Sequence, residues 1–175
     1  SPALDEFTAE VRKSGGGLET TLRLLRGRMN EAQRRRFESL YRPDVVRRIF
    51  QEYYAGPRLC RQFYGFDPEY FSGPGLVERE RPIIDLSLVK HLKKDGIVFG
   101  VLSGRTPEEA DYVLEKLGLD GYLHPRGRVV DDGSLPGKPD PSGLMYLARE
   151  MRFRQAVYAG DVPDDWTTVE AYRKT

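Results

Sequence analysis

Residues 97–107 read Ile-Val-Phe-Gly-Val-Leu-Ser-Gly-Arg-Thr-Pro, a continuous apolar run that ends in a short polar turn. An apolar run such as 97–102 is typical of a strand buried in a parallel sheet. The next pair is a typical helix start, with Thr106 as the N-cap and Pro107 in the first turn. The stretch therefore predicts an α/β sheet whose functional residues follow the strand ends.

The flanking residues continue this alternation of helices and strands. Apolar positions at helical spacing predict helices over 85–94, 107–117, 142–151 and 166–174. Gly118 is expected to close the second of these helices, and a short apolar strand is predicted over 156–159. Alternating helices and buried strands form right-handed crossovers, so we expect residues 76–175 to form a Rossmann-like α/β core, a parallel sheet in three layers.

Residues 1–75 have a different character. Eleven Lys or Arg and only four acidic residues fall within 11–48. Leucines and aromatic residues recur at helical spacing, Pro43 suits the first turn of a helix, and Gly56-Pro57 is expected to end that helix. Ser-Gly-Pro-Gly at 72–75 is the clearest break in the chain. We therefore expect a separate all-helical domain over 1–75.

The composition excludes several classes of function. The chain has 175 residues and a net charge of +1, which argues against a protein built mainly to bind nucleic acid. Cys60 is its single cysteine, so no intramolecular disulfide is expected, and its two histidines are too few for an all-protein zinc cage. No apolar run is long enough to span a membrane, and no signal-peptide pattern begins the sequence. We expect a cytoplasmic protein that binds neither nucleic acid nor membranes; a homodimer is compatible with the sequence.

Two loops carry residues suited to an anion. Ser103-Gly104-Arg105 offers a hydroxyl, a glycine amide and a guanidinium at the start of a helix. The same residues also suit an ordinary strand-to-helix turn. Lys138 lies between a glycine and a proline on a stiff loop, where its ammonium can neutralise a phosphate or a carboxylate. The alternative for this second loop is a polar turn that leads into the next helix.

A third loop carries three carboxylates, at Asp161, Asp164 and Asp165. Clustered carboxylates repel one another unless they are solvated or share a cation. Oxygen ligands on a tight loop suit Mg²⁺. One of Asp164 and Asp165 is expected to cap the following helix, but the three together predict a metal site.

In chain order, Ser103-Gly104-Arg105, Gly137–Pro141 and Gly160–Asp165 resemble the second, third and fourth motifs of the haloacid dehalogenase (HAD) superfamily. The resemblance is to the phosphatase-like branch, subfamily IA type, with a helical cap. It covers about 86–174, while the helical half matches only in kind. It implies a Mg²⁺-dependent phosphatase that hydrolyses a small phosphate monoester through an aspartyl-phosphate intermediate. The implied partner is therefore a small phosphorylated metabolite.

The resemblance also assigns roles to the residues of these loops. Ser103 and Lys138 are the implied catalytic residues: the first hydrogen-bonds the transferring phosphoryl group, and the second steadies its charge and the nucleophile. Gly104 and Arg105 join them as substrate-binding residues, although Arg105 lies outside the family's core chemistry. The implied metal ligands are Asp161, Asp165 and Asp164. This set agrees with the physical demands of phosphoryl transfer, in which positioned charges and donors carry most of the catalysis.

One motif of the family is missing. Asp-x-Asp at the end of an apolar strand, which supplies the aspartate nucleophile and the general acid/base, does not occur before Gly75. In the family its strand lies between those of the second and fourth motifs. We therefore expect roughly 20–35 residues with this strand to precede Ser1, and a closing strand to follow Thr175. The alternatives are a catalytically inactive binding or regulatory protein, and a phosphomutase or other phosphotransferase of the same superfamily.

Overall fold

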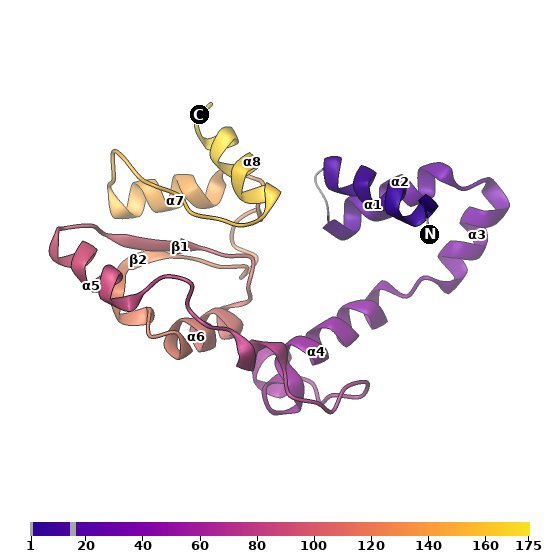
Figure 1. The fold of residues 1–175 in the computed structure, drawn as a ribbon, viewed down its shortest axis with the longest axis horizontal. Helices are drawn as coiled ribbons and strands as arrows, with labels where there is room; N and C mark the ends of the chain where they lie inside the picture. The colour runs from indigo at the N-terminus through magenta and orange to yellow at the C-terminus, as the bar shows by residue number, and fades with distance from the viewer. Residues whose placement is uncertain (1, 15–16) are drawn as a thin grey trace.

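The structure, a computed structural model, describes residues 2–14 and 17–175. Its first half is helical, as predicted, and consists of α1 (Pro2–Lys13), α2 (Gly17–Arg28), α3 (Glu31–Leu40) and α4 (Pro43–Tyr64). Figure 1 shows α1, α2 and α3 at the end of α4 that lies farther from the strands. Within the described ranges, no helix has both the length and the apolar character needed to cross a membrane.

Helix α4 bends at Gly56 and does not end there. Gly56 has φ +66° and ψ 171°, a conformation open almost only to glycine. The bend lets the chain at Gly75 pass against α4, where a Cβ atom on Gly56 would lie 2.4 Å from the Gly75 nitrogen. Pro57 then begins a second helical segment, because its missing N–H costs nothing in a first turn. The predicted stop is therefore a bend between two helical segments.

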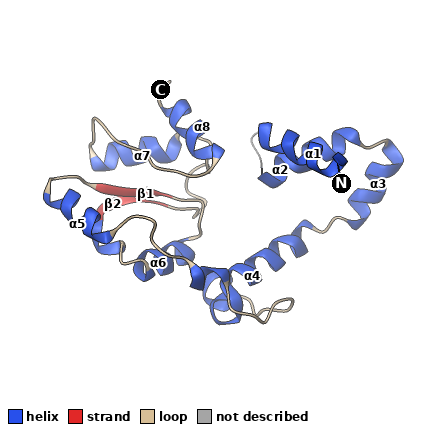
Figure 2. Ribbon diagram, viewed as in Figure 1, coloured by secondary structure: helices blue, strands red, loops and turns tan. Residues whose placement is uncertain are grey.

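The second half alternates helices with two strands (Figure 2). Its elements are η1 (Leu76–Arg79), α5 (Leu86–Lys94), β1 (Phe99–Leu102), α6 (Pro107–Lys116), η2 (Asp120–Tyr122), β2 (Leu123–Val129), α7 (Ser142–Met151) and α8 (Pro163–Tyr172). The predicted helices over 85–94, 107–117 and 142–151 are confirmed within one residue. Gly118 follows the second of them with φ +67°, as a helix-ending glycine should. The last helix begins three residues earlier than predicted, at Pro163.

The sheet contains two parallel strands, β1 and β2, in the part of the chain that the structure describes. Figure 1 shows α7 and α8 on one side of these strands and α5 and α6 on the other. The strand predicted over 156–159 is wrong: these residues form no strand, and Val157 is 98% exposed. A strand needs a neighbour for its backbone groups, and no described segment pairs with this one. The parallel sheet is therefore smaller than the predicted Rossmann-like one.

Two hydrophobic cores hold these elements together. The first joins α4, η1 and α6 and contains Ala55, Leu59, Cys60, Phe63, Val77 and Val113. The second joins β2 to α7, contains Val129, Leu144 and Leu147, and includes the partly buried Val169 and Tyr172 of α8 at its edge. Because the first core takes residues from both sides of Gly75, the end of α4 is packed firmly against α6. The domain boundary at residue 75 stays a prediction.

The bend at Gly56 gives a test of this packing. Gly56→Ala should lower the free energy of unfolding by about 2 kcal/mol or more, because alanine is strained at this φ and its Cβ meets the Gly75 backbone. Denaturant unfolding measures the change. Gly27→Ala, in α2 with open space around its Cα, is the control and should stabilise by about 0.5–1 kcal/mol. Equal stability of the Gly56 variant and wild type would contradict the strained bend.

Candidate active site

The Ser103 turn follows directly from β1 and leads into α6. The Ser103 amide donates to the Val129 carbonyl at 2.9 Å, which extends the pairing of β1 with β2 into the turn. Thr106 caps α6: its hydroxyl accepts from the Glu109 amide, and the Glu109 carboxylate accepts from the Thr106 amide at 2.9 Å. The interpretation of this stretch as a strand-to-helix turn is thus confirmed. Ser103 and the exposed Gly104 stand at the mouth of that helix.

Lys138 and Asp165 form the most buried ion pair of the described chain. The Lys138 Nζ atom lies 2.6 Å from Asp165 Oδ1, and the two side chains are 19% and 7% exposed. The Tyr158 hydroxyl donates to the same oxygen at 2.8 Å. The second oxygen, Oδ2, accepts from the backbone amides of Asp161 and Val162 at 3.0 and 3.2 Å. Asp165 therefore both caps α8 and anchors the lysine, so capping is confirmed for one of the two candidate aspartates.

The titration of this cluster follows from its contacts. Burial alone would raise the pKa of Asp165, but the hydrogen bonds from Lys138, Tyr158 and the Val162 amide outweigh it, so the pKa lies below its ordinary value. Burial, and then the hydrogen bond to Asp165, raise the pKa of Tyr158 well above the usual range of a phenol. Asp165 thus stays ionised and Tyr158 stays a hydrogen-bond donor at neutral pH. Tyr158 was missed from the sequence because it was assigned to a strand.

The three acidic residues do not gather around one point. Both oxygens of Asp165 face inward to protein donors, whereas Asp161 and Asp164 are exposed. Among the described residues, no three His, Cys, Asp or Glu side chains lie close enough together to hold a metal ion. Mg²⁺ commonly binds one or two carboxylates and keeps several waters, so Asp161 and Asp164 are the carboxylates of this loop that stay open to such an ion. Asp165 fits an orienting role better than direct ligation.

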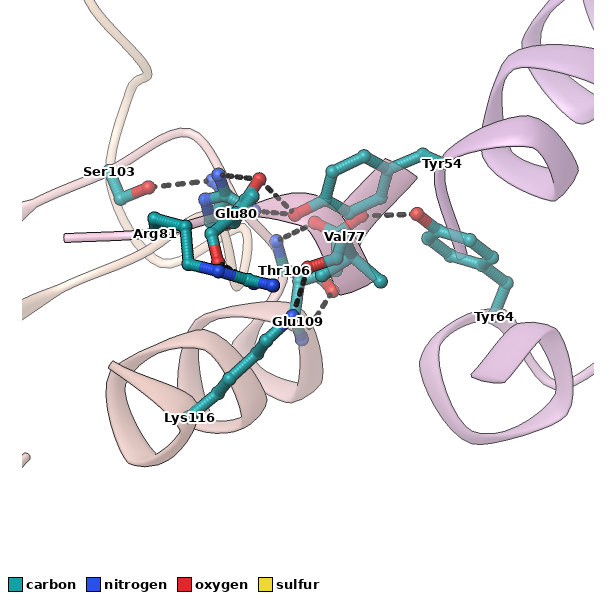
Figure 3. Close-up of polar contacts among 10 residues, drawn as sticks. Tyr54, Tyr64, Val77, Glu80, Arg81, Ser103, Thr106, Glu109 and Lys116 are labelled. Carbon is teal, nitrogen blue, oxygen red and sulfur yellow. Dashed lines mark hydrogen bonds and ion pairs between the residues drawn. The ribbon is translucent and has the colours of Figure 1, made fainter. Parts of the chain in front are cut away.

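Arg105 is paired with Tyr54 of α4 and with Glu80, which follows η1. Its guanidinium donates to the Tyr54 hydroxyl and, through Nη2, to Glu80 Oε1 at 2.9 Å. The Tyr54 hydroxyl donates to the same Glu80 oxygen at 3.0 Å, and Figure 3 shows Tyr54 and Glu80 meeting near Ser103. Burial raises the pKa of Glu80 and lowers that of Arg105. Nothing in the sequence pattern singled out Tyr54 or Glu80, since both act across the fold.

The predicted site residues thus fall into two groups. Lys138, Asp165 and the Asp161 backbone form one, and Ser103 with Arg105 forms the other. No hydrogen bond or ion pair in the described ranges joins Ser103 to Lys138. The two groups are connected through a shared core. Ser103 bonds to Val129, and Val129 belongs to the core against which Tyr158, a partner of Asp165, also packs.

The fold and these loops define an α/β domain with charged residues at the helix starts. A family model described as haloacid dehalogenase-like hydrolase matches residues 74–168, more than half of the chain, and the chain belongs to this family. The match includes Ser103, Lys138 and the three acidic residues of the third loop, and membership supports a hydrolase-type enzyme. No curated protein and no solved structure matches the chain.

Removal of the buried charge tests the Lys138–Asp165 pair. Asp165→Asn keeps the volume and leaves the lysine ammonium largely buried without a counter-charge, so the free energy of unfolding should fall by about 3 kcal/mol at pH 7. Denaturant titration measures it. Glu31→Gln breaks an exposed pair with Arg35 and should change stability by less than about 0.5 kcal/mol. Similar small changes in both variants would show that the pair contributes little.

The same pair predicts a pH dependence. Because the pKa of Asp165 is lowered by folding, its contribution to stability is complete above the ordinary pKa of an aspartate and is lost as the pH falls through the lower folded value. The difference in unfolding free energy between wild type and Asp165→Asn should therefore shrink below about pH 4. A difference that stays constant from neutral to strongly acidic pH would contradict this assignment.

Proposed function

We propose that this protein is a Mg²⁺-dependent phosphatase that hydrolyses a small phosphate monoester through an aspartyl-phosphate intermediate. The observation that carries the proposal is the anchored ammonium of Lys138, held by Asp165 within the region matched by the hydrolase family. A fixed cation beside an acidic loop suits a reaction whose transition state spreads negative charge over phosphoryl oxygens. In the proposal a Rossmann-like three-layer core, residues 76–175, works beneath a helical cap, residues 1–75.

Each residue has a definite task in this proposal. The Ser103 hydroxyl and the Gly104 amide donate to the phosphoryl oxygens at the mouth of α6, where the helix start favours an anion. Lys138 neutralises developing charge and, being tied to Asp165, needs no reorganisation during the reaction. Asp161 would hold the metal with Asp164 nearby. Bound Mg²⁺ would supply charge neutralisation at the phosphate.

The proposed reaction proceeds in two displacements. An aspartate carboxylate attacks phosphorus, and the bond from phosphorus to the ester oxygen breaks as a general acid gives that oxygen a proton. The deprotonated acid then takes a proton from the water that attacks phosphorus, and phosphate and the free carboxylate are released. The family's Asp-x-Asp motif, which would supply this carboxylate, does not stand in 1–75. The proposal therefore assigns the nucleophile to no residue of 1–75, and measured phosphatase activity tests this step.

The partner that we propose is a small phosphorylated metabolite in the cytoplasm, with no role for nucleic acid or membranes; a homodimer remains compatible. The net charge of +1 supports a small ligand over a nucleic acid, since no global positive field would attract a polyanion.

Metal removal is the first test of activity. The full-length protein should hydrolyse a generic aryl phosphate with Mg²⁺ present and lose this activity in excess chelator, with recovery when Mg²⁺ is restored. Release of inorganic phosphate is the readout. Failure with every phosphate monoester tried would overturn the proposal. Binding of inorganic phosphate without turnover would favour the alternative, an inactive binding or regulatory protein, and transfer to a second alcohol would favour a phosphomutase.

Single substitutions test the two charged groups. Asp161→Asn should abolish turnover with the fold intact, because it removes a metal ligand's charge without a change in volume. Lys138→Ala should cost roughly 2.7–4 kcal/mol of transition-state stabilisation, as for other preorganised electrostatic groups. Steady-state rates per folded protein measure both, with Asp120→Asn, outside the predicted site, as the control that keeps wild-type turnover. Wild-type turnover in Asp161→Asn would rule out the proposed metal ligand.

A further inference from the structure

Arg105 makes contacts in two directions, and these connect α4 to the Ser103 turn. Its guanidinium is fixed by Tyr54 and Glu80, as described above, and its Cζ atom lies 5.3 Å from the centre of the Tyr54 ring. Its side chain is 33% exposed and that of Glu80 is 26% exposed, so water only partly screens the ion pair. Two of the five N–H donors of the guanidinium are thus used by protein partners, which favours a positioning task over binding of a substrate.

The backbone of Arg105 contacts the turn itself. Its amide donates to Ser103 Oγ at 3.2 Å, and its carbonyl accepts from the Asp131 amide at 2.9 Å. A serine hydroxyl has two acceptor lone pairs and one proton to donate. Because Ser103 accepts from Arg105, its proton remains available for an anionic oxygen outside the turn. The direction of that proton therefore depends on where the Arg105 backbone is held.

A second tyrosine of α4 is connected to Thr106, the last residue of the turn, through Glu109. The Tyr64 hydroxyl donates to Glu109, whose other carboxylate oxygen accepts from the Thr106 amide at 2.9 Å. Tyr54 and Tyr64 lie on either side of the bend at Gly56, and both pack against the hydrophobic core that joins α4 to α6. The α6 end of the turn, at Arg105 and Thr106, is thus held by two tyrosines of α4, while its β1 end is bonded to Val129.

We propose that Arg105 is a positioning residue for Ser103, and that Tyr54 and Glu80 act through it. The inference rests on the proposed function, in which Ser103 donates to the phosphoryl group. Anchoring a long side chain at its tip restricts the backbone that carries it, and the Arg105 amide in turn orients the serine hydroxyl. Arg105 is then required for catalysis without touching the substrate.

Kinetics of three variants test this role. Tyr54→Phe keeps the ring and its packing and removes only the hydroxyl, Arg105→Lys keeps the charge and loses the fork of donors, and the third variant combines both. Each single variant should lower kcat about tenfold with KM nearly unchanged, and the double variant should lose little more, because the residues act as one unit. Tyr53→Phe is the matched control: Tyr53 is on the same helix, 48% exposed, with its ring against Phe71, and should keep wild-type kinetics. A rise in KM confined to Arg105→Lys would overturn the proposal and make Arg105 a substrate ligand.

A measurement without substrate separates this proposal from the proposed function. In Tyr54→Phe the Arg105 amide should exchange its hydrogen with solvent several-fold faster than in wild type, because its acceptor Ser103 is less firmly placed. The amide of Val129, in β2, should keep its rate, and Tyr53→Phe should change neither. If no phosphate ester is hydrolysed, the proposed function fails, yet faster exchange at Arg105 would still establish the coupling. Unchanged exchange at Arg105 in Tyr54→Phe would overturn it.

Discussion

A carboxylate can be buried only if donors replace the water it loses, and Asp165 meets this condition with all four of its contacts. Lys138 and Tyr158 satisfy one oxygen, and the amides of Asp161 and Val162 satisfy the other. These donors come from the loop before α7 and from the segment before α8, and Asp165 itself lies in the first turn of α8. The single charge thus fixes three segments relative to one another. The Asp161 side chain is exposed, while the amide of the same residue donates to Asp165.

The Ser103 turn is fixed by a different part of the molecule. The Ser103 amide bonds to Val129, which belongs to the core of β2 and α7. The end of the turn that leads into α6 is attached to α4. Further polar contacts strengthen the second attachment, since Lys116 donates to the Val77 carbonyl at 2.7 Å and Arg58 pairs with Glu78. The turn therefore lies between two separately packed cores.

Local signals in the sequence were sufficient for most helices and for the position of β1, but the strand begins two residues later than the predicted 97–102 and none of its residues is fully buried. Thr106 and Pro107 define the start of α6 through groups within four residues, and the apolar periods of α5 and α7 are equally local. The strand β2 was not predicted because Pro125 and Gly127 lie within it and are typical of turns. The strand over 156–159 failed for the opposite reason, since an apolar run forms a strand only where a neighbour accepts its hydrogen bonds.

In the candidate site, too, local signals identified the residues, but contacts between distant residues could not be predicted. The sequence identified the residues that carry chemistry, including Lys138 and Asp165, from residue type and loop position. It could not show that these two would pair, because 27 residues separate them. It assigned Arg105 to the substrate because a guanidinium beside glycine suits an anion, whereas its partners Tyr54 and Glu80 are 51 and 25 residues away. Long-range pairing therefore decides which charges are available to a ligand.

The charge balance of the paired residues bears on the metal. Both cations expected at the site have a carboxylate partner, Lys138 with Asp165 and Arg105 with Glu80. The exposed carboxylates Asp161 and Asp164 then leave the acidic loop negative, and a phosphate dianion would be repelled there. An additional cation removes this repulsion and gives both carboxylate and phosphate oxygens a common partner, as hard divalent ions do. Because Lys138 already balances Asp165, its single ammonium cannot also balance Asp161, Asp164 and a phosphate dianion, and this charge balance supports the Mg²⁺ dependence proposed above.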